Sequence, residues 1–78
     1  SDVYKRQLYD MTEEISCDYS ELDSFVIFIC MEGACKIRDN EGYELTVNAG
    51  ESILLPATTQ DVTITPEGGN VKLLETYV

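Results

Sequence analysis

Cysteine spacing is the first chemical feature of this sequence. Cys30 and Cys35 are separated by four residues, a spacing that can bring two thiolates to one metal ion. A structural zinc site needs four ligands, usually Cys or His, so this pair requires more. The sequence has no histidine and only one further cysteine, Cys17. We therefore predict three free thiols, as expected in a reducing cytoplasm, and no metal ligands in this chain.

Carboxylates offer two other kinds of chemistry, ion binding and acid–base catalysis. The run Asp39–Gly42 (DNEG) resembles an ion-binding loop, but calcium loops alternate their ligands, so a type I turn is the better interpretation. Glu13 and Glu14 are adjacent, and on a strand they would point to opposite faces. Glu32 follows an apolar run, and we interpret it as a strand end that faces solvent.

Nucleophiles and phosphate-binding loops complete the chemical inventory. Ser24 and Ser52 have no histidine to act as a base. Gly68 and Gly69 follow Pro66 and indicate a turn, not a phosphate loop that opens a helix. The sequence therefore predicts no catalytic, cofactor-binding or metal-binding residue in this chain.

The charge balance excludes several classes of partner. The 78 residues include 15 acidic and 5 basic side chains, which gives a formal net charge of −10. Such a surface repels nucleic acids and anionic membranes. The longest apolar run, Phe25–Met31, is far shorter than the roughly 20 residues that cross a bilayer as a helix. We expect a cytoplasmic location.

Turn residues divide the chain into short segments with the two-residue periodicity of strands. Cys35 and Ile37 alternate with Lys36 and Arg38, for example, as in a strand with one buried face. The segment Ser16–Asp23 is polar and is expected to be a loop. The expected strands are Leu8–Ile15, Ser24–Glu32, Ala34–Asp39, Tyr43–Val47, Glu51–Leu55, Asp61–Thr65 and Val71–Val78. Their number and spacing predict an all-β antiparallel sandwich or barrel, with Ser24–Glu32 buried on both faces.

Three segments resemble a known family. Asp23–Gly33 is similar to the strand that enters the second cupin domain of class I mannose-6-phosphate isomerases. Gly50–Ala57 (GESILLPA) is similar to that family's G-[DE]-x-x-L-[IL]-P-A segment, and Val71–Val78 to its closing strand. Gly50 and Pro56 also fit the start of the general second cupin motif, G-x5-P. The resemblance covers Leu8–Val78 in order.

The resemblance implies a cupin-like jelly-roll fold that is incomplete at its N-terminus. It implies a parent enzyme that interconverts mannose 6-phosphate and fructose 6-phosphate with a zinc ion. The family's zinc ligands, a Gln, a Glu and two His, come from the first cupin domain, and a catalytic Arg also lies upstream. Gln7 and Gln60 lie outside the matching motif, so none of these roles transfers to this chain.

We therefore expect residues 8–78 to be an inactive C-terminal fragment whose partner is the upstream cupin domain. The alternative is a stand-alone, non-catalytic cupin-like module that binds a small molecule or oligomerises, for instance through exposed strand edges. Residues 1–7 (SDVYKRQ) resemble a translated sequencing adapter, and we expect them to be non-native.

Overall fold

The computed structural model describes residues 5–22 and 24–77, and these residues form strands, turns and loops without a helix. The strands are β1 (Lys5–Met11), β2 (Ile15–Asp18), β3 (Val26–Glu32), β4 (Ala34–Asp39), β5 (Glu44–Asn48), β6 (Ser52–Leu55), β7 (Asp61–Pro66) and β8 (Val71–Tyr77). Within the described residues, no helix exists that could cross a membrane.

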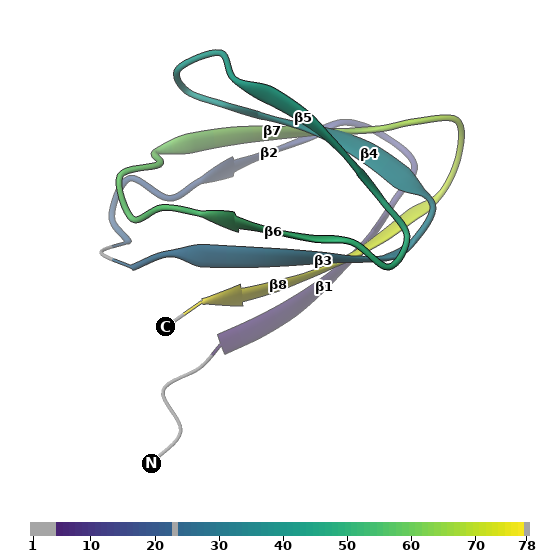
Figure 1. Ribbon diagram of the computed structural model, residues 1–78, viewed down its shortest axis with the longest axis horizontal. Helices are drawn as coiled ribbons and strands as arrows, with labels where there is room; N and C mark the ends of the chain where they lie inside the picture. The colour runs from purple at the N-terminus through teal and green to yellow at the C-terminus, as the bar shows by residue number, and fades with distance from the viewer. Residues whose placement is uncertain (1–4, 23, 78) are drawn as a thin grey trace.

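The strands form two four-stranded antiparallel sheets that face one another (Figure 1). The first sheet has the order β1-β8-β3-β6, and the second has the order β2-β7-β4-β5. Consecutive strands therefore alternate between sheets at several points, as in a jelly roll. The sandwich has two edges: β1 and β2 border one of them, and β6 and β5 border the other.

The core lies between the sheets and follows the alternation of the strands. Every second residue of β3 points inward, and Phe28 is completely buried there. Ile64 on β7 and Leu73 on β8 are also completely buried. These side chains contact one another across the two layers, so the centre of the sandwich is closed to water.

The sequence predicted most of the strands. The β4–β5 hairpin, β6 and β7 lie where they were expected, to within one or two residues. As predicted, Cys35 and Ile37 are buried on β4 while Lys36 and Arg38 are exposed. The last strand is confirmed from Val71 to Tyr77, and the expected final residue lies outside the described ones.

Three predictions about the strands were wrong. The segment expected to be a loop contains β2, because Ile15 and Cys17 turn inward and pair with Ile64 and Val62 of β7. The first expected strand ran through Glu13 to Ile15, but β1 ends at Met11 and a turn follows. β3 is buried on its inner face only, since its outer face is half-exposed.

The turn between β3 and β4 requires glycine. Gly33 has a φ of +78°, and a Cβ there would lie 2.4 Å from the backbone oxygen of Asn70. Only a residue without a side chain fits such an approach. Gly33 thereby joins the β3–β4 turn to the loop before β8.

Residues 5–7 are part of β1 and pair with the end of β8, from Lys5 opposite Tyr77 to Gln7 opposite Glu75. Residues 1–4 lie outside the described residues. The foreign origin of residues 1–7 stays a prediction.

Candidate functional site

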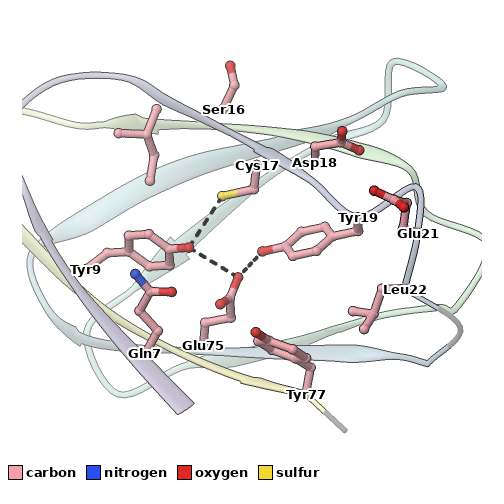
Figure 2. Close-up of a pocket in the computed structure, with 11 residues that line it drawn as sticks. Gln7, Tyr9, Ser16, Cys17, Asp18, Tyr19, Glu21, Leu22, Glu75 and Tyr77 are labelled. Atoms are coloured by element: carbon pink, nitrogen blue, oxygen red, sulfur yellow. Dashed lines mark hydrogen bonds between the residues drawn. The ribbon is translucent and has the colours of Figure 1, made fainter. Parts of the chain in front are cut away.

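A pocket of about 570 Å³ opens at the edge of the sandwich bordered by β1 and β2 (Figure 2). We call it the polar pocket. Strands β1, β2 and β8 and the loop after β2 contribute its walls. Its lining consists of Gln7, Tyr9, Ile15, Ser16, Cys17, Asp18, Tyr19, Glu21, Leu22, Glu75 and Tyr77.

Glu75 is the centre of the polar pocket. It is only 2% exposed, because it occupies an inward position on β8 in register with the inward residues Val71 and Leu73. Its Oε2 accepts hydrogen bonds from the hydroxyls of Tyr19 and Tyr9, the latter at 3.4 Å. Figure 2 shows the two tyrosines reaching the carboxylate from opposite sides. A buried carboxylate is costly without such donors.

The groups around Glu75 are held in their protonated forms. Burial raises the pKa of Tyr9 and Tyr19 well above the ordinary value for a phenol, and the nearby Cys17 and Glu75 add to this effect. Burial also raises the pKa of the Cys17 thiol, whose Sγ donates to the Tyr9 hydroxyl over 3.9 Å. These groups are therefore hydrogen-bond donors near neutral pH, not bases or nucleophiles.

The polar pocket is suited to binding more than to catalysis. Its described lining has three carboxylates, Asp18, Glu21 and Glu75, and no lysine or arginine. Proton transfer at neutral pH needs a group whose pKa lies near 7, and the phenols and the thiol are shifted away from it. A phosphate would find no positive partner in this lining.

A second concavity, of about 210 Å³, lies at the opposite edge between β5 and β6. We call it the apolar groove. Its lining includes Ile37, Leu45, Ile53 and Leu55. Leu45 is paired with the inward-facing Ile37 and is nevertheless 52% exposed, so core-facing surface is uncovered at this edge.

The structure places Cys30 and Cys35 in the core, each at most 1% exposed. As predicted, both are free thiols, as is Cys17. Burial raises the pKa of Cys30, and it raises that of Cys35 to about 11. The described residues contain no group of three or more His, Cys, Asp or Glu side chains that could hold a metal ion. They therefore do not fit the zinc site that the resemblance implies for the parent.

The run Asp39–Gly42 is a turn, as predicted. The Asp39 Oδ1 accepts hydrogen bonds from the backbone N–H groups of Glu41 and Tyr43 at 2.9 and 3.0 Å. The Gly42 N–H donates to the Asp39 carbonyl, which closes the turn. The carboxylate of Asp39 is therefore occupied by its own backbone.

Of the other residues singled out by type, Gln7 lines the polar pocket, and the rest lie apart from it. Glu32 forms an exposed ion pair with Lys72 at 3.8 Å, and Glu14 accepts a hydrogen bond from Thr65 at 3.0 Å. The remaining members of this set are not in its lining: Glu13, Ser24, Ser52, Gln60, Gly68 and Gly69.

Sequence reasoning missed Tyr19 and Glu75 and assigned no role to Tyr9. A signal existed in β8, where Glu75 interrupts the inward series that begins with Val71 and Leu73. A carboxylate at an inward position of a closing strand indicates a buried polar partner or a pocket.

The fold defines a cupin-type domain. Three solved structures share it: a cupin-2 domain protein from Shewanella frigidimarina (22% identity, TM-score 0.75), a protein from Neisseria meningitidis (14%, 0.80), and an Archaeoglobus fulgidus protein assigned provisionally as a mannosephosphate isomerase (22%, 0.80). They match 97%, 96% and 95% of this chain, which spans 71%, 74% and 23% of theirs. At these identities the likeness shows the fold alone.

The family follows from the sequence match. Residues 3–78 match the family described as mannose-6-phosphate isomerase, cupin domain, and the chain belongs to that family. The match begins inside the segment of residues 1–7. No curated protein matches the chain.

Proposed function

We propose that this chain is the C-terminal cupin region of a mannose-6-phosphate isomerase and that its role there is structural. The family match over residues 3–78 carries this proposal. The parent would interconvert mannose 6-phosphate and fructose 6-phosphate in the cytoplasm, with its zinc ion held by the upstream cupin domain. That ion would act as a Lewis acid on the sugar oxygens. The chain's own residues would provide packing surface.

An apolar outer face supports the structural role. On the outer side of the β1-β8-β3-β6 sheet, Leu8 lies opposite Leu74, and Leu74 lies opposite Ile29. Ile27 of β3 lies opposite Leu54 of β6. Leu8 is 56% exposed and Leu54 is 60% exposed. Apolar side chains that adjoin across four strands indicate a surface that another part of a protein covers.

The apolar groove is a second uncovered surface. Tyr43 and Leu45 line it, and they are 73% and 52% exposed. The chain spans only 23% of the Archaeoglobus protein, so a longer parent has ample chain to cover such surfaces. We propose that the upstream domain of the parent covers the outer face, where apolar side chains adjoin across all four strands of the sheet.

The test of identity begins with the gene. Genomic DNA upstream of residue 8 is amplified, and an open frame that encodes a histidine-containing cupin half is expected. The parent protein should then isomerise mannose 6-phosphate in a coupled assay. A start codon directly before Leu8, or a purified parent without activity, would overturn the proposal. Genomic codons for SDVYKRQ would show that residues 1–7 are native.

The docking surface has a separate test by thiol labelling. In Leu54→Cys, the new thiol lies on the outer face of the first sheet. In the control Thr46→Cys, it lies at an exposed position on β5, in the other sheet. We expect L54C to react as fast as T46C in the 78-residue chain and much more slowly in the parent. Equal reactivity in the parent would contradict the docking surface. Protection that grows with concentration of the short chain would assign the face to a second copy instead.

A further inference from the structure

The polar pocket is large enough to hold a small molecule. Its volume of about 570 Å³ falls within the range of small-molecule sites, about 300–1,000 Å³. The structural role proposed above uses the outer face of the sheet and leaves this pocket without a task. From its chemistry we propose that it binds a small organic ammonium ion, of the primary amine type.

The hydrogen-bonding capacity of the pocket favours a ligand that donates. Both phenol hydrogens are directed to Oε2 of Glu75, so Tyr9 and Tyr19 have only lone pairs left to offer. Within the described residues, no hydrogen bond reaches Oε1 of Glu75. Since none of their buried side-chain oxygens lacks a partner, Oε1 is the atom through which this largely buried carboxylate meets the pocket. The site is therefore rich in acceptors. A primary ammonium group carries three donors and no acceptor.

The charge of the pocket lining also favours a cationic ligand. Asp18 at the end of β2 and Glu21 on the loop after it line the pocket together with Glu75 (Figure 2). No lysine or arginine belongs to the described lining. A cation gains from this field, whereas a carboxylate or a sugar phosphate is repelled.

Aromatic and apolar walls suit an organic cation better than a bare metal ion. The rings of Tyr9, Tyr19 and Tyr77 line the pocket together with Leu22. Cations are attracted to aromatic rings, and the alkyl part of an amine gains from apolar contact. The described residues also offer no three-ligand metal cluster. The ammonium head would lie at Oε1 of Glu75, with its alkyl chain against the rings.

The test uses three probes of nearly equal shape and different charge. n-Butylammonium, 1-butanol and butyrate are titrated by calorimetry into the protein at its full native length. Measurable binding is expected for n-butylammonium, at least about tenfold tighter than for 1-butanol, with none for butyrate. A tenfold ratio corresponds to about 1.4 kcal/mol. No binding of the amine, or equal binding of the alcohol, would overturn the proposal.

A pair of variants locates the binding. Glu75→Gln keeps a carbonyl acceptor for the two phenols and removes the charge, and it should weaken the amine at least about tenfold. The control Glu41→Gln removes one charge from an exposed turn outside the pocket lining and should leave the affinity unchanged. Equal affinity in E75Q and E41Q would contradict the assignment, even if an amine binds elsewhere on the protein.

A measurement on the unsubstituted protein covers the case in which E75Q does not fold. Cys17 lines the pocket and is half-buried. Bound n-butylammonium should slow alkylation of Cys17, and 1-butanol at the same concentration should not. An unchanged alkylation rate at saturating amine would refute the site. These readouts do not depend on isomerase activity, so the proposed function can fail while this inference stands.

Discussion

The two open edges of the sandwich contrast in chemistry although both lie between the same two sheets. At the β1/β2 edge, the polar pocket gathers a buried carboxylate and the tyrosines that bind it. At the β5/β6 edge, the apolar groove exposes Leu45 and Tyr43. At the first edge, Oε2 of Glu75 is hydrogen-bonded by both tyrosines, and Oε1 is open to a ligand. The second leaves apolar surface in contact with water.

The contrast indicates different occupants for the two edges. An apolar surface is stabilised when protein covers it, because the hydrophobic effect depends on the area removed from water and not on the direction of the contacts. A pocket lined by ordered acceptors gains from a ligand with matching donors, which can come and go. The apolar edge therefore suits contact with protein, and the polar edge suits the small-molecule ligand proposed above.

The centre of the sandwich separates these edges, and Phe28 is its largest fully buried side chain. Its ring lies 6.4 Å from the ring of Tyr19, so it supports the polar pocket as well as the core. We expect Phe28→Ala to lower the free energy of unfolding by about 3–5 kcal/mol, since it removes a buried ring and leaves a cavity. Denaturant unfolding measures this loss.

Phe25→Ala is the matched control for that substitution. Phe25 is 39% exposed and precedes β3. Its loss should cost about 1 kcal/mol or less, as for most surface substitutions. Equal losses of unfolding free energy in the two variants would contradict the central place of Phe28 in the core.

The sequence predicted the central strands better than the polar edge. The sequence pattern predicts β3 from its β-branched residues and β4 from its alternation, as in Cys35 and Ile37. It does not predict β2, because Ser16 and Asp18 make this segment polar and only its pairing with β7 produces a strand. The polar pocket combines Tyr9 with Glu75, 66 positions apart, and no local pattern encodes such a meeting. The family resemblance, by contrast, was readable from three segments and is confirmed.

Alkaline pH should destabilise the core of the sandwich. Burial raises the pKa of Cys35 to about 11 from the model-peptide value of 9.0. The folded state therefore holds this proton more tightly than the unfolded state. The resulting stability is fully present below pH 9 and is lost as the pH rises through about 11. Two pKa units correspond to about 2–3 kcal/mol.

Thermal unfolding between pH 8 and 11 measures that loss. The raised pKa values of Tyr9 and Tyr19 act in the same direction, so part of the decline should remain in Cys35→Ala. Relative to its own value at pH 8, however, C35A should lose less stability at pH 11 than the unsubstituted chain. Identical pH profiles for the two proteins would show that Cys35 is not held neutral by the core.

The same substitution at each edge gives the sharpest comparison. Tyr19→Phe removes a buried hydroxyl that donates to Glu75, and Tyr43→Phe removes a hydroxyl from a residue that is 73% exposed. In Y19F the carboxylate keeps only the Tyr9 donor at 3.4 Å. Removing a donor from a buried charged acceptor lowers the free energy of unfolding by about 1–3 kcal/mol. Removing a solvated hydroxyl lowers it by about 0.5 kcal/mol or less. In a domain of this size, 1 kcal/mol shifts the melting temperature by about 4–8 °C. Y19F should therefore melt several degrees below Y43F. If the two variants melted together, Oε2 of Glu75 would have to find a donor other than Tyr19, and the buried hydrogen bond would not distinguish the polar edge from the apolar groove.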